Sequence, residues 1–253
     1  MRFFETLLVA VSTYSILPVP QFEWNEKNMR YAICCFPVVG LFCGAALLLW
    51  NWFCCRMQVS PVLFAVVAVC LPLLITGGIH MDGYMDTVDA LASHQSRERK
   101  LEIMKDSACG AFAVLYCGVY LLLCFGLLHE VYEAGNMLSY APVYVLSRSL
   151  SALCAVTLPN ARNAGMLCAF TENAQKNRAV AAMLVVAVLA AAGMIWLNTI
   201  CGSIVAACVL LTVLGYRHMA VLQFGGATGD TSGFFLQVCE LAALIGIWLG
   251  GLL

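Results

Sequence analysis

Long apolar runs, separated by short polar segments, make up most of the sequence. A helix needs about 20 apolar residues to cross a bilayer, within roughly 17–25, and seven stretches approach that length. They are residues 31–55, 61–78, 108–128, 137–158, 180–199, 202–217 and 233–253, of which 202–217 is the shortest. The pattern predicts an all-α fold, a polytopic transmembrane helical bundle of about seven spans.

The N-terminal apolar run superficially resembles a secretory signal peptide. Glu5 interrupts the run, no A-x-A cleavage site follows, and Pro18 and Pro20 close it. We therefore expect a retained segment that forms a short interfacial or half-inserted helix.

The composition is that of a membrane protein. Hydrophobic residues make up 62% of the chain and charged residues 11%, against about 45–50% and about 25% in soluble domains. The net charge of -1 lacks the basic excess of nucleic-acid-binding proteins. No polar stretch is long enough to fold alone, so residues 1–253 form a single integral membrane domain. The fourteen cysteines lie mostly in apolar runs without a C-x-x-C pair, so we expect small hydrophobes rather than zinc ligands or disulfides.

Lys and Arg collect in alternate polar segments. If residues 1–30 are cytoplasmic, then so are 79–107, 159–179 and 217–232, and together these segments hold 11 of the 13 basic residues. Because cytoplasmic loops carry the excess of Lys and Arg, the pattern predicts a cytoplasmic N-terminus and a C-terminus on the opposite side.

The acidic residues concentrate in residues 79–107, which contain six of the fourteen. Asp82, Asp86 and Asp89 recur at i, i+4 and i+7, so a helix places them within about 60° of arc. Three like charges on one face repel each other unless a cation lies between them, and hard oxygen ligands suit Mg²⁺, Mn²⁺ or Ca²⁺. The spacing therefore predicts a divalent metal site.

The second half of this segment, residues 97–106, predicts another helix with Ser96 at its N-cap. Its acids recur at i, i+4 and i+8 on one side, at Glu98, Glu102 and Asp106. Residues 90–96 are short enough to turn the two helices antiparallel, so their acidic faces could meet as a metal cage. Basic residues of the second helix could then hold an anionic substrate: Arg97, Arg99, Lys100 and Lys105.

The alternative is that 79–107 is a solvated connector whose charges keep a loop in water. However, Asp82 follows closely on an apolar run that ends in Gly77-Gly78, which places it at the membrane rim, and 159–179 contains only one acid, Glu172. A need for solubility would not collect carboxylates in one segment, so we favour the metal site.

A glycine-rich turn, residues 225–233, precedes the last predicted helix. Such a turn offers backbone N–H groups to a phosphate, and Thr228 and Gly229 lie at this point. It lacks the Lys of a Walker A loop, and an ordinary interhelical turn is the alternative. Asp230, near the positive end of the helix dipole, could complete a metal shell.

Arg148 lies within the fourth predicted span, where a charge is costly in lipid and therefore faces the bundle interior. It is either the structural partner of a buried acid such as Glu240 or a contact for substrate phosphate. Carboxylates at the rim of a bundle indicate chemistry on a phosphorylated substrate, because phosphoryl transfer needs a cation to neutralise the phosphate oxygens.

Several motifs along the chain resemble, in the same order, those of the adenosylcobinamide-GDP ribazoletransferase family, whose members are also called cobalamin 5'-phosphate synthases. The residues that carry the resemblance are Leu17-Pro18-Val19-Pro20 with Trp24, Phe36-Pro37-Val38-Val39-Gly40, residues 77–83 with Asp86 and Asp89, residues 97–107, Gly110-Ala111-Phe112, and residues 226–230 with Glu240. Ala113 stands where we expect glycine in the family.

The resemblance implies a Mg²⁺-dependent, multi-pass enzyme of the bacterial cytoplasmic (inner) membrane, with a cytoplasmic active site. The 3'-hydroxyl of α-ribazole 5'-phosphate, or of α-ribazole, would attack the corrinoid-side phosphorus of adenosylcobinamide-GDP and release GMP. It is a phosphotransferase for substituted phosphate groups, and other enzymes of cobalamin synthesis are candidate partners.

The resemblance also assigns roles to the polar residues. The expected Mg²⁺ ligands are Asp82, Asp86 and Asp89, with Asp106 and Asp230 as further ligands or supports. The expected general base is one of these carboxylates, Asp82 or Asp86 for example, or His80, although His80 could equally cap a helix end. The expected substrate contacts are Arg97, Lys105, Arg148, Thr228 and Gly229.

Two other classes of membrane protein share part of this pattern. The CDP-alcohol phosphotransferases also place aspartates on membrane helices, but their D-G-x-x-A-R signature does not match, because Asp82-Gly83 is followed here by Met85-Asp86. A transporter or metal channel would place ionisable residues at mid-membrane, whereas the acids of this chain cluster at one rim.

Overall fold

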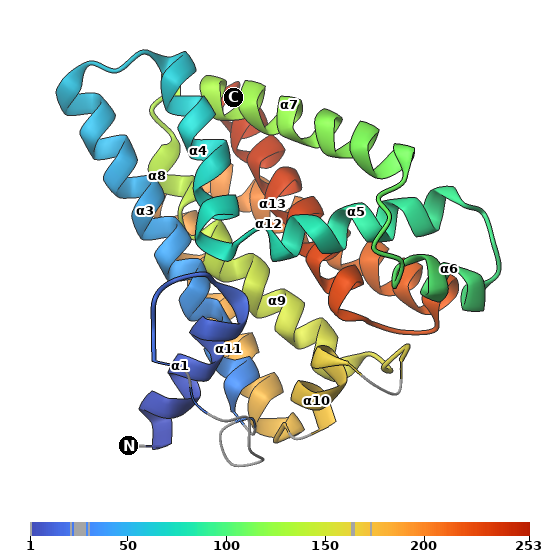
Figure 1. The fold of residues 1–253 in the computed structure, drawn as a ribbon. Helices are drawn as coiled ribbons and strands as arrows, with labels where there is room; N and C mark the ends of the chain where they lie inside the picture. Colours follow the sequence, from blue (N-terminus) through green and yellow to red (C-terminus); the bar gives the residue numbers. More distant parts are fainter. Residues whose placement is uncertain (1, 21, 23–28, 30, 163–164, 173) are drawn as a thin grey trace.

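A computed structural model describes residues 2–20, 22, 29, 31–162, 165–172 and 174–253. All regular elements in these ranges are helices, which confirms the predicted all-α fold (Figure 1). Trp24, Lys27 and Arg30, which contributed to the family motif and the charge pattern, lie outside the described residues.

Five helical stretches in the described ranges are long and apolar enough to cross a membrane. They are η1 with α3 (Ala32–Cys35, Phe36–Met57), α7 (Ala111–Glu133), α11 (Lys176–Leu197), α12 with the π-helical turn η2 (Thr199–Met219, Ala220–Phe224), and α13 (Gly229–Gly251). They correspond to five of the predicted spans and fit a multi-pass membrane protein.

The predicted span 61–78 belongs to a bent pair of helices. α4 (Pro61–Thr76) ends at Gly77 and Gly78, whose φ angles of 65° and 78° favour glycine. α5 (Ile79–Ala92) then leaves at 95° to α4. The two helices count as a sixth span only when they are joined. Because α5 carries three aspartates, we treat it as a rim helix outside the membrane-spanning segments.

The predicted span 137–158 divides at Pro142 into α8 (Met137–Tyr140) and α9 (Val143–Thr157). The proline ring interrupts the hydrogen bonding of a continuous helix. The 15 residues of α9 reach about 22 Å, against about 30 Å for the hydrocarbon core of a bilayer. The structure therefore supports five or six spans where the sequence indicates about seven.

Glycines allow α9 to lie at the centre of the bundle, beside α3, α11 and α13 (Figure 1). A Cβ on Gly40 of α3 would be 2.3 Å from the carbonyl oxygen of Tyr144 in α9. A Cβ on Gly250 of α13 would likewise be 2.7 Å from the Cα of Cys201 in α12. Small residues at these crossings let the helix backbones touch, as in other membrane bundles.

Three short helices surround the polar end of the bundle. α1 (Arg2–Tyr14) is the short N-terminal helix that the sequence predicts, and α10 (Met166–Glu172) lies near it, away from the C-terminus of the chain (Figure 1). α6 (Arg97–Ile103) begins at the predicted N-cap, where Ser96 Oγ accepts from the amide of Arg99 at 3.4 Å. It ends three residues earlier than expected.

Candidate active site

Two polar loops are joined at this end of the bundle. Residues Pro159 to Ala161 run parallel to Ala227, whose amide donates to the Pro159 carbonyl at 2.8 Å and whose carbonyl accepts from the Ala161 amide at 2.9 Å. A Cβ on Gly226 would be 2.1 Å from that Pro159 oxygen, so the close approach requires glycine. The bridge places the side chain that follows, Arg162, beside the start of α13.

The N-terminus of α13 follows the glycine-rich turn directly and is capped by two threonines. Thr228 Oγ1 accepts from the amide of Thr231 at 3.0 Å, and Thr231 Oγ1 accepts from the amide of Thr228 at 2.8 Å. Both threonines are buried. This reciprocal capping box fixes the direction in which the first amide groups of α13 point.

α5 packs closely along the first turns of α13. A Cβ on Gly83 would be 2.9 Å from the Cα of Asp230, and one on Gly233 would be 2.9 Å from the carbonyl oxygen of His80. The aspartates of α5 therefore come to lie near Asp230, although almost 150 residues separate them in the sequence.

The charged side chains that meet here, on α5, α13 and the loop after α9, interact electrostatically. Asp230 forms an ion pair with Arg162 at 2.9 Å, with the two side chains 25% and 22% exposed. The pKa of Asp86 is raised to about 6, because the side chain is partly buried and because Asp82, Asp230 and Asp89 carry like charge, while Arg162 opposes the shift. A cation that entered this group of carboxylates would relieve the repulsion.

A cavity of about 180 Å³ opens next to these side chains. Asp82, Arg162 and Asp230 line it together with Thr228 and Gly229 of the α13 N-terminus. A smaller, more apolar cavity shares part of its wall, including Tyr14 of α1 and His80 of α5. The site thus combines carboxylates, a guanidinium and free helix-start amides around one space.

His80 borders both cavities but is itself only 6% exposed. Its ring lies 5.6 Å from the ring of Phe36 and 6.4 Å from that of Tyr14. Its Nε2 is buried without a hydrogen-bond partner in the part of the chain that the structure describes. Burial, and to a lesser degree the charge of Arg148, hold the pKa of His80 well below its ordinary value, so the imidazole is neutral near pH 7.

Asp89 and Asp106 bind backbone amides. The two carboxylate oxygens of Asp89 accept from the amides of Gly110 and Ala113 at 2.6 Å and 2.8 Å, and so cap the start of α7. Asp106 is exposed and accepts from the amide of Ala108 at 3.0 Å. Both aspartates therefore have a local structural task.

The second predicted helix does not turn its acids toward α5. Glu102 is 63% exposed and pairs with Arg99 on the surface. Hydrogen bonds from its own backbone amide and from Ser96 lower the pKa of Glu98. Neither glutamate is among the charges that shift the pKa of Asp86, so the cage of two facing acidic helices is not formed.

The basic residues of α6 differ in their contacts. Arg97 donates to the carbonyl of Val221 in η2 at 3.3 Å, and the buried Lys100 binds the side chain of Gln223 in the same turn. Lys105 is exposed. Together with Arg162, which also donates to the Leu101 carbonyl at 3.2 Å, these contacts join the three loops that the charge pattern assigns to one side.

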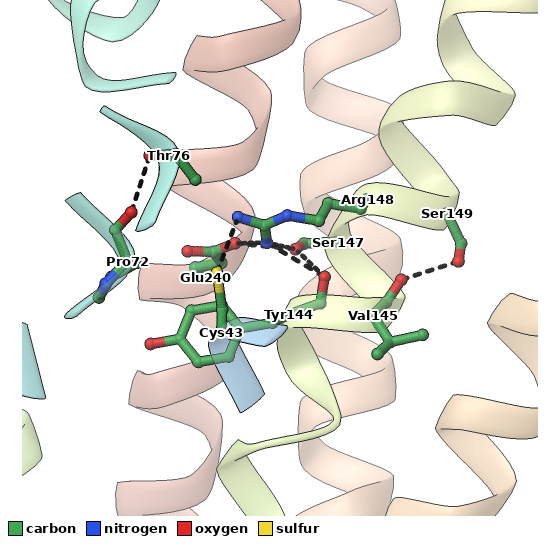
Figure 2. A network of polar contacts seen from close by, with 9 residues as sticks. All are labelled: Cys43, Pro72, Thr76, Tyr144, Val145, Ser147, Arg148, Ser149 and Glu240. Atoms are coloured by element: carbon green, nitrogen blue, oxygen red, sulfur yellow. Dashed lines mark hydrogen bonds and ion pairs between the residues drawn. The ribbon is translucent and has the colours of Figure 1, made fainter. Parts of the chain in front are cut away.

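Arg148 lies deep in the bundle, as Figure 2 shows. Its Nη1 is 2.7 Å from Glu240 Oε1, and the two side chains are 1% and 5% exposed. Ser147 donates to the same oxygen at 2.9 Å, and Arg148 also donates to the Tyr144 carbonyl at 3.1 Å. Of the two roles open to Arg148, pairing with Glu240 is therefore the one present in the structure.

Arg162 is the site residue that sequence reasoning missed. It is one of three basic residues in the predicted loop 159–179, and no motif distinguishes it from Lys176 and Arg178. Only the contact between the loops at Ala227 brings it to Asp230.

The apolar helices and this acidic cavity define a multi-pass membrane protein with a carboxylate-rich site at one end of its bundle. The family model described as cobalamin-5-phosphate synthase matches residues 6–248. The chain belongs to that family, which confirms the resemblance seen in the motifs.

Curated relatives are similar to this chain over more than nine tenths of their length. A protein of Lachnoclostridium phytofermentans is 40% identical over 96% of this chain and 93% of its own length, and its name is adenosylcobinamide-GDP ribazoletransferase. Proteins of the same name from a Geobacillus species and Clostridium botulinum are 33% and 30% identical, over 96% and 95% of this chain and 94% and 96% of their own lengths. No solved structure matches the chain.

Proposed function

We propose that this protein is a Mg²⁺-dependent adenosylcobinamide-GDP ribazoletransferase that uses α-ribazole 5'-phosphate, or α-ribazole, as acceptor and releases GMP. The observation that carries the proposal is the family match over residues 6–248, combined with Asp82, Asp230 and Arg162, which line one cavity, and with Asp86, whose pKa responds to their charges. Transfer of a substituted phosphate group needs positioning and charge neutralisation, and little covalent chemistry from the protein.

The donor set suits Mg²⁺. In the described residues, no three His, Cys, Asp or Glu side chains already converge to hold a metal ion. Mg²⁺, however, usually binds through one or two carboxylates, with substrate phosphates and water completing its octahedron. We propose that one or two of Asp82, Asp86 and Asp230 bind the ion, and that Asp89 and Asp106 support the site through the amides that they cap.

The reaction that these residues would support is an in-line displacement. The acceptor 3'-hydroxyl oxygen forms a bond to the corrinoid-side phosphorus, the bridging P–O bond breaks, and GMP leaves with the bridging oxygen. Bound Mg²⁺ would neutralise charge on the diphosphate oxygens. The hydroxyl proton passes to a base. The candidates are neutral His80, which lines the cavity, and, if Asp82 and Asp230 alone bind the metal, Asp86, whose pKa of about 6 lies close to pH 7.

We place the protein in the bacterial cytoplasmic membrane with the site facing the cytoplasm. Two observations support this orientation. The segments that carry most Lys and Arg alternate with the apolar ones, as the positive-inside rule requires. Three of these segments contact one another through Arg162, Arg97 and Asp230, as segments on one side of a membrane would.

The test is turnover by the purified full chain in lipid nanodiscs. Wild type supplied with adenosylcobinamide-GDP, α-ribazole 5'-phosphate and Mg²⁺ should release GMP and form a cobalamin 5'-phosphate. Asp82→Asn or Asp86→Asn should lower GMP release about a hundredfold, equivalent to about 3 kcal/mol of transition-state stabilisation. Glu102→Gln, a surface carboxylate outside the cavity, is the matched control.

Full GMP release at low Mg²⁺ in either aspartate variant would contradict the metal assignment. Metal flux into proteoliposomes, without turnover of any nucleotide-activated substrate, would contradict the transferase and favour a transport protein.

A further inference from the structure

Arg162 reaches into the acidic site but is only partly satisfied there. Its Nη1 pairs with Asp230 at 2.9 Å and its Nη2 donates to the Leu101 carbonyl at 3.2 Å. Its Nε is buried and has no hydrogen-bond partner in the described ranges. A guanidinium has five N–H donors in a rigid fork, so Arg162 retains donor capacity toward the cavity that it lines.

Asp230 stands between two possible cations. Its carboxylate is neutralised by Arg162 and is repelled by the negative charge of Asp82. A divalent ion bound by Asp82 and Asp230 would therefore compete with the guanidinium for the same oxygens. A carboxylate cannot give its best geometry to both at once, because each needs short, directed contacts.

The cavity offers a place for the displaced guanidinium and for a phosphate. Nothing lies within 4 Å of a Cβ placed on Gly229, and Gly229 lines the cavity, so the cavity reaches the first turn of α13. The cap uses the amide of Thr231 and leaves the preceding amides available to an anion. Arg162, on the opposite loop, lines the same cavity, and arginine binds phosphate oxygens in pairs.

We propose that Arg162 neutralises Asp230 in the metal-free protein and moves to the diphosphate of the donor substrate when that substrate and a divalent cation bind together. Arg162 is then a substrate-binding residue whose resting position also keeps the metal site from filling in the absence of substrate. This inference rests on the proposed function, since it takes the substrate to be a nucleotide-activated diphosphate.

The exchange predicts effects of opposite sign for one substitution. Arg162→Gln frees Asp230, so a divalent ion should bind more tightly in the absence of substrate. The same change removes a phosphate partner, so the donor substrate should bind more weakly. A merely structural role for Arg162 would weaken both, because a distorted site loses both ligands.

The experiment measures the two affinities separately in full-length protein in nanodiscs. Mn²⁺ binding without substrate is followed by electron paramagnetic resonance, and the KM for adenosylcobinamide-GDP by GMP release at saturating Mg²⁺. For Arg162→Gln we expect Mn²⁺ binding about fivefold tighter, within the usual range of coupling between two ligands of one site. We expect the KM to rise about tenfold, and kcat to change less.

Two further variants make the test decisive. Arg56→Gln, which removes an exposed charge in the last turn of α3, should leave both affinities unchanged. Arg162→Lys retains the positive charge but loses the fork, so it should keep Mn²⁺ affinity near wild type and still raise the KM. If Arg162→Gln does not fold, as judged by its thermal unfolding, the test of the proposal is the KM of the Arg162→Lys variant.

Unchanged or weaker Mn²⁺ binding in a folded Arg162→Gln protein would overturn the proposal, and so would an unchanged KM in either variant. Absence of GMP release by the wild type is a different result. It would contradict the proposed function, while the Mn²⁺ measurement would still show whether Arg162 and a divalent ion compete for Asp230.

Discussion

The ion pair between Arg148 and Glu240 is buried almost completely, with 1% and 5% of the side chains exposed and 2.7 Å between Nη1 and Oε1. Removing one partner of such a pair costs about 3–5 kcal/mol of the free energy of unfolding, because the other charge is left without compensation. The hydrogen bonds from Ser147 and to the Tyr144 carbonyl (Figure 2) would be weakened with it.

The two single substitutions should not cost the same. In Arg148→Met the remaining Glu240 can take up a proton and become neutral, whereas in Glu240→Met the remaining guanidinium cannot lose its charge. We therefore expect about 3 kcal/mol for Arg148→Met and about 5 kcal/mol for Glu240→Met. The double methionine variant should cost less than the sum, because no charge remains in the core.

The assay is equilibrium unfolding in detergent micelles, with the four proteins of the double-mutant cycle compared at one pH. Arg99→Met in the exposed pair with Glu102 is the control, and it should cost less than about 1 kcal/mol. Additive costs in the double variant, or equal costs in the two single variants, would refute the argument that a stranded charge dominates.

Three further predictions concern the supports of the site. Asp89→Ala removes the cap of α7 and should lower the free energy of unfolding by about 1–2 kcal/mol. The Mg²⁺ concentration needed for activity should not change. An increase of tenfold or more in that concentration would instead indicate that Asp89 binds the metal. Glu98→Gln and Glu102→Gln should keep GMP release within about twofold of wild type, since both are surface residues. A large loss of GMP release would instead support the metal cage between the two acidic helices. Gly226→Ala, whose Cβ would be 2.1 Å from a loop carbonyl, should lower the thermal unfolding temperature by several degrees, while Gly118→Ala, with nothing within 4 Å, should not.

The elements that the sequence predicts best are those that depend on local pattern. The length of the apolar runs was enough to locate α7, α11 and α13, and Ser96 marked the start of α6. The run at 137–158 forms two helices rather than the single one expected, because Pro142 interrupts the hydrogen bonding of a continuous helix. The second of them, α9, has 15 residues and lies among the other helices of the bundle.

The candidate site was predictable where it follows from spacing on one helix. Asp82 and Asp86 lie one turn apart on α5, and the packing of α5 on α13 brings Asp230 near them. Arg162 could not be predicted, since its place depends on a loop-to-loop bridge between residues far apart in the chain. The capping role of Asp89 could not be predicted for the same reason, because the amides that it caps belong to the start of another helix.

The close packing of α5 on α13 has a consequence for how a large substrate is admitted. Glycines lock these two helices together, and the rings of Tyr84 and Phe234 stack across them with centroids 5.6 Å apart. The opposite wall of the cavity consists of Tyr14 on α1 and residues 166–168 on α10. A corrin ring is far larger than the 180 Å³ cavity, so we expect the wall formed by α1 and α10, rather than the packed pair of α5 and α13, to move when such a substrate binds. The carboxylates would keep their mutual spacing during that movement, so the proposed metal site would stay in place while substrate and product exchange.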